Sequence, residues 1–562
     1  MLLHRTARPR ATAVVFSLAL TFSTWASAGV VVLTSNTSTP QTVAATDSLS
    51  VQPSVTLTST TATPAVTWAG SSGAGPVVNN AGVIQNTFNT GASSGRAIDM
   101  NFTSASSSFT LNNNAGATIT SGNDVFRVNK SIGSGTLVVN NSGVMSSTGL
   151  NGNSNGQAID FNANTTLTGV VTINNFAGAV MSAADADAIR PGNLATINNF
   201  GSIVGNTTGD TGNDGIDYQD PGKSGTVNNF GAASSITGAR HGITAKEAIT
   251  VFNAGLIEGR AGSGLNIDTT TNAVAMVVTN TASGRIVGHA VAGADADGID
   301  IDRLAIINNA GLISAQGLSS GTNLNEAIAI GGGSVVNQAG GRILSDQRAI
   351  TVDDSNLGNA FAAFTLSNDG TITGGNGEAL RIISQLGNSV TNRGTINGSV
   401  VLGSGADAVF LATGSSLNGL LDGGDGVDVL HLQGSGLGTL GQTASVEELL
   451  VDAGDWTLDS GSDYHFGTLS LQAGSSLSLG GANVFSVFTA SLLGVQLNGG
   501  VVTNLFGGQG FNLYYLADAV GNGYLGGRNY LLSGGGSLIA VPEPASAALV
   551  LAGLFLLRRR RA

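Results

Sequence analysis

The sequence contains no cysteine, few charged residues and no long apolar run in its interior. The absence of cysteine excludes disulfides, zinc–thiolate sites and cysteine nucleophiles together. Charged residues make up 10% of the chain, and the net charge is -13. Because the dense arginine clusters lie only at the two ends of this acidic chain, nothing predicts nucleic-acid binding. No interior segment reaches about 18 consecutive apolar residues, so no interior membrane-spanning helix is predicted.

The first part of the chain has the pattern of a secretory signal peptide, expected over residues 1–28. A basic segment precedes a mostly apolar segment over residues 11–22, and the small residues Ala26 and Ala28 fit the expected cleavage site. The mature chain is therefore expected to begin near Gly29.

The last part of the chain, residues 541–562, combines prolines, an apolar run and arginines. The run over residues 545–557 would form a helix of about 20 Å, shorter than a hydrocarbon core of about 30 Å. Arginines after this run favour the cytoplasmic side, which predicts an inner-membrane anchor with the bulk of the chain outside that membrane. The motif residues are Val541, Pro542, Glu543, Pro544, Arg558, Arg559, Arg560 and Arg561.

This order of elements resembles the PEP-CTERM sorting signal of Gram-negative bacteria. The resemblance implies that an exosortase-type enzyme recognises and processes residues 541–562. It also implies brief retention at the inner membrane through residues 545–557, followed by passage of the body to the cell surface or the extracellular matrix.

The body of the chain is built from two repeated motifs. In the first, an apolar residue is followed by Asn, one or two further residues, Gly and a second apolar stretch, as in Val78-Asn79-Asn80-Ala81-Gly82. From Gly82 to Gly394 the glycines of successive copies are on average about 28 residues apart, a period typical of solenoids. The second motif, as in Ala97-Ile98-Asp99-Met100, lies between copies of the first. Each repeat is expected to supply at least two short strands.

The residue types of the first motif explain why it recurs. Apolar residues on either side of Asn-x-Gly alternate with polar ones and can share a core, while Asn and Gly suit a sharp corner. In stacked coils, equivalent Asn side chains lie about 4.8 Å apart and can form a hydrogen-bonded ladder. We therefore predict an all-β protein with a right-handed parallel β-helix over residues 77–435. Residues 29–76 are predicted to form an N-terminal cap with the first strands, and residues 436–540 a β-rich C-terminal cap.

The repeats also resemble the passenger regions of autotransporter adhesins, and the likeness extends through residues 396–407 and 421–430. The resemblance implies a β-helix with terminal coils. An autotransporter would continue into a membrane barrel of alternating strands of about ten residues, which this sequence lacks. The sorting segment is therefore the expected export route in place of a barrel.

Three aspartates are candidates for a metal site. The segment from Gly423 to His431 matches a calcium-binding nonapeptide pattern, and the segment from Gly403 matches it in part. Asp407 and Asp428 are one coil apart and, together with Asp425, offer the hard oxygen ligands that calcium prefers. Ordinary Gly-Asp turns are the alternative interpretation. No other cofactor is predicted.

Two functions remain open. The first is a non-enzymatic surface or matrix rod that adheres or associates with exopolysaccharide. The second is a polysaccharide lyase or glycosidase with acids such as Asp187, Asp217 and Asp300 on one flank. Because these positions alternate with other residue types in the repeats, and Arg190 and Arg303 do not recur with the acids, the flank is predicted to be a solvated outer face. Three or more acids converging with an arginine in a groove would favour the enzyme.

Overall fold

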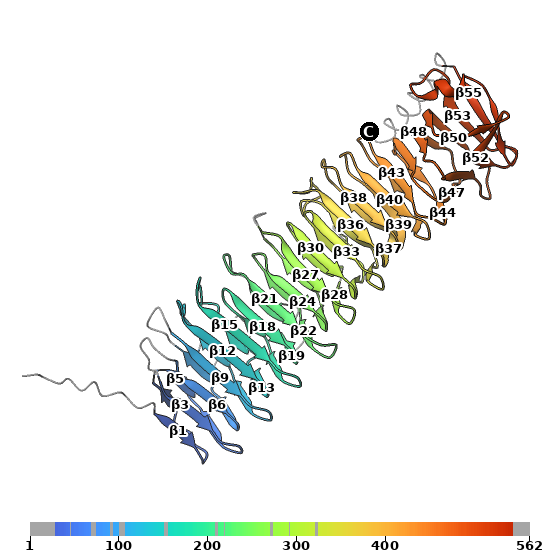
Figure 1. The fold of residues 1–562 in the computed structure, drawn as a ribbon. Coiled ribbons are helices and arrows are strands. Elements are labelled where there is room, and N and C mark those ends of the chain that lie inside the picture. The colour runs from blue at the N-terminus through green and yellow to red at the C-terminus, as the bar shows by residue number, and fades with distance from the viewer. Residues whose placement is uncertain are drawn as a thin grey trace, which may run out of the picture.

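The computed structural model describes residues 29–44, 46–68, 75–89, 94–100, 107–150, 156–207, 212–218, 220–269, 274–291, 293–320 and 324–542. Over these residues the protein is a rod of stacked, mainly parallel β-strands that follow one another from the N-terminal to the C-terminal end (Figure 1). In the described part of the chain, no helix is both long enough and apolar enough to cross a membrane. The expected signal peptide lies outside the described residues.

Most coils of the rod contribute one strand to each of three parallel ladders. The first ladder runs the whole length of the rod. Its strands are β1 (Val30–Leu33), β3 (Ser48–Val51), β6 (Val77–Asn80), β9 (Phe109–Asn113), β12 (Thr136–Asn141), β15 (Val170–Asn175), β18 (Ala195–Asn199), β21 (Gly225–Asn229), β24 (Thr250–Asn253), β27 (Met276–Asn280), β30 (Ala305–Asn309), β33 (Gly333–Asn337), β36 (Phe364–Asn368), β38 (Ser389–Asn392), β40 (Ala408–Ala412), β43 (Val429–Gln433), β46 (Glu448–Val451), β48 (Tyr464–Leu471), β50 (Ser486–Leu493), β53 (Asn512–Leu516) and β55 (Ser537–Val541).

The second ladder follows the Asn-x-Gly corner of each coil. Its strands are β4 (Thr56–Ser59), β7 (Val83–Asn86), β10 (Thr118–Ser121), β13 (Val144–Ser147), β16 (Val180–Ala183), β19 (Ser202–Val204), β22 (Ser235–Gly238), β25 (Leu256–Gly259), β28 (Arg285–His289), β31 (Leu312–Gln316), β34 (Arg342–Ser345), β37 (Thr371–Ile382), β39 (Thr395–Val401) and β41 (Ser416–Asn418).

The third ladder is formed by the second repeated motif, and β37 and β39 are long enough to belong to both ladders. Its other strands are β2 (Gln41–Val43), β5 (Val66–Trp68), β8 (Ile98–Met100), β11 (Phe126–Val128), β14 (Ile159–Asp160), β17 (Ile189–Arg190), β20 (Ile216–Tyr218), β23 (Ile243–Ala245), β26 (Leu265–Ile267), β29 (Ile299–Ile301), β32 (Glu326–Ile330), β35 (Arg348–Val352), β42 (Leu421–Asp422) and β45 (Thr443–Ala444).

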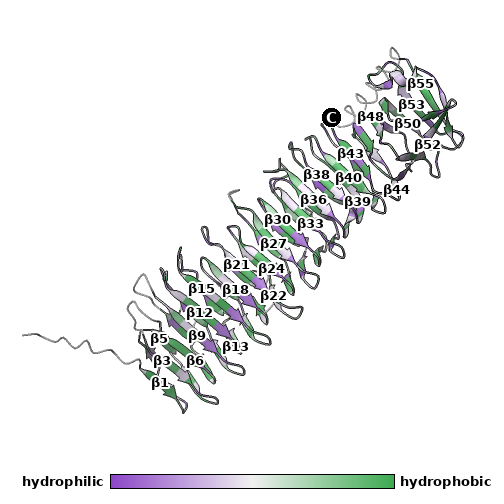
Figure 2. Ribbon diagram, in the orientation of Figure 1, coloured by the Kyte–Doolittle hydropathy of each residue, from purple (hydrophilic) through white to green (hydrophobic). Residues whose placement is uncertain are grey.

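The core forms because the strands alternate between buried and solvent-facing residues. In β12 and β15, for example, every second residue is buried and its neighbours are half-buried or exposed. Figure 2 shows the resulting interleaving of hydrophobic and hydrophilic positions along the strands. An all-β structure with long parallel sheets, of the β-solenoid kind, is thus confirmed.

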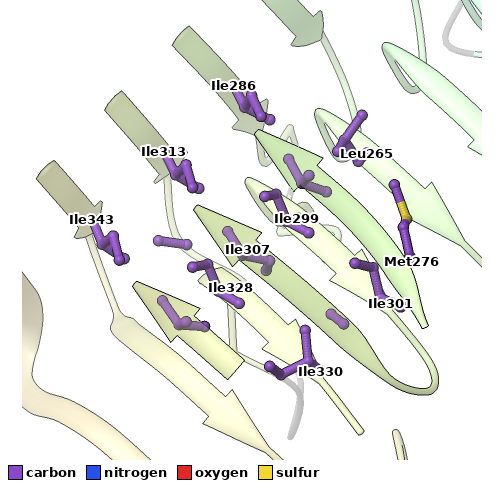
Figure 3. Close-up of a cluster of buried hydrophobic side chains, with 14 of the residues drawn as sticks. Leu265, Met276, Ile286, Ile299, Ile301, Ile307, Ile313, Ile328, Ile330 and Ile343 are labelled. Carbon is purple, nitrogen blue, oxygen red and sulfur yellow. The ribbon is translucent and has the colours of Figure 1, made fainter. Parts of the chain in front are cut away.

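In-register stacking places like residues above one another in the core. Ile286, Ile313 and Ile343 are aligned across three successive coils of the second ladder. Ile299 and Ile328 are aligned in the third ladder, facing the same interior (Figure 3). All five are buried, and each such side chain contributes about 1.5–3 kcal/mol relative to leaving it exposed.

A ladder of buried asparagines runs along the corner between the first and second ladders. From Asn80 to Asn368, each side-chain amide donates to the side-chain oxygen of the equivalent Asn in the next coil, over 2.7–2.9 Å. The predicted amide ladder is therefore confirmed. Its members are Asn80, Asn113, Asn141, Asn175, Asn199, Asn229, Asn253, Asn280, Asn309, Asn337, Asn368 and Asn392.

Ladder asparagines also form hydrogen bonds with the backbone of the corners. Asn229, for example, donates a second hydrogen bond to the carbonyl oxygen of Leu256 in the next coil, over 3.0 Å. In Asn199, the side-chain oxygen accepts from the backbone N–H of Gly201, two residues on. Because the corner backbone is buried and would otherwise lack partners, Asn is favoured at this position for hydrogen bonding as well as for turn geometry.

The C-terminal end closes with antiparallel pairing. An additional parallel ladder is formed by β44 (Leu437–Leu440), β47 (Asp455–Leu458), β49 (Ser476–Leu479), β52 (Val501–Gly507) and β54 (Tyr530–Ser533). The short β51 (Leu497–Asn498) pairs antiparallel with β52, and β54 pairs antiparallel with β55. A single turn of 3-10 helix, η1 (Asn522–Leu525), lies between β53 and β54. These hairpins interrupt the parallel edge that an open solenoid end would present.

Candidate functional site

Two columns of mainly polar residues follow the third ladder. The first column precedes each strand or begins it, except in the long β37, where Glu378 lies within the strand. It comprises Arg96, Asp124, Gln157, Asp187, Asp214, His241, Ser263, Asp297, Glu326, Arg348 and Glu378. The second column lies three residues further on in each coil. It comprises Asp99, Arg127, Asp160, Arg190, Asp217, Thr244, Asn266, Asp300, Ala329, Thr351 and Arg381.

Carboxylates of the first column have a structural task. Asp187 accepts the backbone N–H of Asp214 over 2.7 Å, and Asp214 accepts that of His241 over 3.1 Å. Asp297 accepts the backbone N–H of Glu326 over 2.7 Å in the same way. One oxygen of each acid therefore completes the hydrogen bonding of the next coil's turn, which gives a structural reason for acids to recur at this position.

A first carboxylate cluster consists of Asp187, Asp214 and Asp217. An oxygen from each lies within 4.8 Å of the others, and all three side chains are buried. Arg190 contacts Asp187 over 2.6 Å and Asp217 over 3.6 Å. Arg240 contacts Asp214 over 2.7 Å. Burial, together with the negative charges of Asp187 and Asp214, raises the pKa of Asp217 to about 8.

The expectation of a solvated outer face is wrong for this cluster. Asp217 is 3% exposed, and Arg190 is paired with two of the acids, although arginine does not recur with the acids along the sequence. Asp187 is only three residues from Arg190, but Asp217 is in the next coil, so its contact with Arg190 forms only when the coils stack and could not be read from local spacing.

A second cluster contains Asp295, Asp297 and Glu326, again with oxygens within 4.8 Å of one another. It borders a pocket of about 150 Å³ in front of β29, β32 and β35. The same pocket is lined by further polar residues, namely Asp300, Asp302, Arg348, Thr351 and Asp353. Of the three acids named for an enzyme, Asp187 and Asp217 are therefore brought together, and Asp300 belongs to this separate site.

The pocket holds more acid than base. Burial, reinforced by neighbouring carboxylates, raises the pKa values of Asp297 and Asp300 well above their usual range. Burial also raises the pKa of Glu326 to about 7. Arg348 is shared between Glu326, at 3.2 Å, and Glu378, at 2.7 Å. Carboxyl groups that titrate near neutrality can donate or accept a proton, and several together can hold a cation.

The calcium candidates are only partly brought together. Asp407 donates its backbone N–H to the Asp428 carboxylate over 2.8 Å, so these two meet as predicted from their spacing. Asp425 is exposed, while Asp422, which we did not select from the sequence, is buried. The negative charge of Asp422 is one of the influences that raise the pKa of Asp428, after burial.

The aromatic residues of the C-terminal cap have two environments. Tyr515 is buried, and its hydroxyl donates to the carbonyl oxygen of Arg528 over 2.8 Å. The ring of Tyr514 stacks on Phe488 with centroids 4.9 Å apart, and Phe488 stacks on His465 at the same distance. One face of the Tyr514 ring is therefore covered by Phe488 and is not open to a sugar ring.

The sorting motif lies almost wholly outside the described residues. Val541 is the last residue of β55 and its carbonyl oxygen accepts the backbone N–H of Ala517 over 3.0 Å. Pro542 follows it, and Glu543, Pro544 and Arg558–Arg561 are not described, nor are Ala26 and Ala28 of the expected cleavage site. Comparisons with protein-family models, with curated proteins and with solved structures found no match.

Proposed function

We propose that this chain is a non-enzymatic exported rod of the cell surface or extracellular matrix, which adheres to or associates with exopolysaccharide. The observation that carries the proposal is the unbroken first ladder from β1 to β55, held by buried asparagines from Asn80 to Asn392. A rigid rod of this kind can hold its two ends apart and present the residues of its sides to a binding partner.

In this proposal the solenoid is right-handed, as parallel β connections almost always are. The chain carries residues 1–28 as a signal peptide and residues 541–562 as the sorting segment, read by an exosortase-type enzyme at the inner membrane. The absence of cysteine from the chain supports folding after export without oxidation, because no disulfide has to form.

Cell fractionation tests the sorting part of the proposal. A tagged full chain and a variant lacking residues 541–562 are expressed in a host that has an exosortase-type system. We expect the full chain at the surface or in the matrix, and the truncated chain in the periplasm or medium. A variant in which Arg558–Arg561 are replaced by serine should accumulate unprocessed. An unchanged location of the truncated chain would contradict the sorting role.

A second candidate function is carbohydrate cleavage, favoured by the pocket at Glu326. Three acids, Asp295, Asp297 and Glu326, converge there with Arg348, the arrangement that favours an enzyme. A close pair of carboxyl groups with different protonation states is what retaining glycosidases use. Incubation of the purified chain with a panel of polysaccharides tests this function. Activity that Glu326→Gln removes and Asp425→Asn leaves intact would support it; no turnover of any substrate would count against it.

A further inference from the structure

Two glycine-rich arcs stack directly on one another before β40 and β43. They are residues 403–407 and residues 423–428, and each ends in a buried aspartate. The backbone N–H of Asn388 donates to Oδ1 of Asp407 over 2.6 Å, and the N–H of Asp407 donates to Oδ1 of Asp428 over 2.8 Å. Oδ1 of each carboxylate therefore accepts a hydrogen bond from a backbone N–H group of the preceding coil.

The second oxygen of each carboxylate has no such partner. Oδ2 of Asp407 and Oδ2 of Asp428 are both buried and make no hydrogen bond of normal geometry, and each residue is 2% exposed. A β-carbon at Gly423 would lie 2.6 Å from Oδ2 of Asp428, so this oxygen lies inside its own arc. A buried carboxylate oxygen without a partner is costly, and a proton, a water molecule or a cation would satisfy it.

No basic side chain can supply that charge locally. From Gly394 to Gly527 the chain has no lysine or arginine, but it has the acids Asp407, Asp422, Asp425, Asp428, Glu447, Glu448, Asp452, Asp455, Asp459, Asp463 and Asp518. In the part of the chain that the structure describes, no ion pair includes Asp407, Asp428 or Glu447.

Neighbouring negative charges further favour a bound cation at this corner. Glu447 accepts the backbone N–H of Asp428 over 2.9 Å, which brings a third carboxylate to the same corner. Burial, with the charges of Asp407, Glu447 and Asp422, raises the pKa of Asp428 to about 7. Burial also raises the pKa of Asp407, against the opposing effect of the amides of Asn388 and Gly403.

We propose that Asp407 and Asp428 bind one Ca²⁺ between the two arcs through their Oδ2 atoms, with carbonyl oxygens of the arcs and water as the remaining ligands. All donors are hard oxygens, which suit Ca²⁺ and not the nitrogen- and sulfur-preferring Zn²⁺. Mg²⁺ demands a regular octahedron at short distance, whereas Ca²⁺ accepts the irregular geometry of two carboxylates and a backbone arc. The site is independent of the proposed surface function and of the acidic pocket.

Calorimetric titration of the chelator-treated full chain with CaCl₂ tests the site. Four proteins are compared: wild type, Asp407→Asn, Asp428→Asn and Asp425→Asn, the last being an exposed aspartate of the same arc. We expect half-saturation at about 0.1–1 mM, in the range of extracellular calcium modules. Asp407→Asn and Asp428→Asn should each bind one equivalent fewer than wild type, and Asp425→Asn should bind the same number. Other acidic clusters are common to all four proteins and cancel.

Thermal unfolding separates loss of the ion from loss of the fold. In chelator, Asp428→Asn should be at least as stable as wild type, because it removes a buried like charge; in 10 mM Ca²⁺, wild type should be the more stable. An equal number of bound equivalents in all four proteins would overturn the proposal. So would a wild-type Tm that rises on acidification but not with Ca²⁺, because a shared proton would then occupy the site.

Discussion

Asn228 and Asn229 donate their side-chain hydrogen bonds in opposite directions along the rod. The amide of Asn229 donates forward to Asn253 in the next coil over 2.8 Å, and that of Asn228 donates backward to Asn198 over 2.9 Å. Asn229 is fully buried, whereas Asn228 faces outward and is half-buried. Successive residues of one strand thus belong to two antiparallel chains of amides, one in the core and one on the surface.

The first prediction contrasts these two neighbours. Asn229→Ala removes one of the two ladder partners of Asn199 and one of the two of Asn253 in a buried corner, so we expect a loss of about 2–4 kcal/mol in the free energy of unfolding. Asn228→Ala removes a half-exposed bond whose partners can reach water, and should cost under about 1 kcal/mol. Urea denaturation of both variants measures the difference. Equal losses in the free energy of unfolding would show that the buried amide ladder stabilises the protein no more than the surface one.

The second prediction concerns pH. Because the folded-state pKa of Asp217 is raised to about 8 and its unfolded pKa is about 3.9, the folded state holds a proton that the unfolded state releases. The contribution of this group is fully present below pH 4 and is lost as pH rises towards 8. Asp217→Asn should therefore raise Tm at pH 8 by about 2 °C or more, with little change at pH 4.

Thermal melts of Asp217→Asn at pH 4, 6 and 8 measure this effect, with Asp425→Asn as a control for removing an exposed carboxylate. Parallel declines of Tm with pH in the wild type and in Asp217→Asn would mean that Asp217 is not the titrating group.

The third prediction separates steric crowding from backbone conformation. Gly424 and Gly414 both have positive φ, +93° and +84°, but only at Gly424 would a β-carbon meet backbone, 1.9 Å from the carbonyl oxygen of Gly403. Both Ala variants bear the left-handed penalty of about 1–2 kcal/mol. Gly424→Ala should cost about 1–3 kcal/mol more, since the arcs must separate. The denaturation midpoints of the two variants measure this difference. Equal midpoints would show that residues 403–407 and 423–428 are not closely packed.

The fourth prediction concerns the guanidinium groups around Glu378. Arg348 is 9% exposed and lies between Glu326 and Glu378, whereas Arg381 is 43% exposed and contacts Glu378 over 3.0 Å. Arg348→Ala leaves the buried carboxylate of Glu326 without its ion-pair partner and should cost about 3–5 kcal/mol, while Glu378 keeps its contact with Arg381. Arg381→Ala should cost under about 1 kcal/mol, as exposed ion pairs do. Denaturation at two salt concentrations measures both; a larger effect of Arg381→Ala would contradict this burial-based ranking.

Local patterns in the sequence predicted the coils because their causes are local. The alternation of apolar and polar residues determines which side chains face the core, and Asn-x-Gly determines the corner. Parallel strands and an amide ladder could therefore be predicted. Asn113, Asn280 and Asn337 were not selected from the sequence. In Asn280 and Asn337 the ladder residue is followed by three residues before the equivalent Gly, which disguises the motif.

The carboxylate clusters could not be predicted in the same way. Asp297 and Glu326 are 29 residues apart, and Glu326 and Arg348 are 22 apart, so no fixed spacing joins them. Their contact depends on the exact length of each intervening turn and on the register between coils. Asp407 and Asp428 were selected because their spacing equals one short coil, but the burial of Asp422 in place of Asp425 follows from the path of the arc.

The register of the first ladder also bears on how the chain is assembled over time. Each strand from β3 to β55 pairs with the strand one coil earlier, so the coil already in place presents the hydrogen-bond donors, acceptors and apolar rows that the next coil needs. Nearest-neighbour contacts of this kind permit growth from one nucleus by successive addition. Coils that emerge first from a ribosome or a membrane pore can then fold first. Each later coil can add to the folded coil before it.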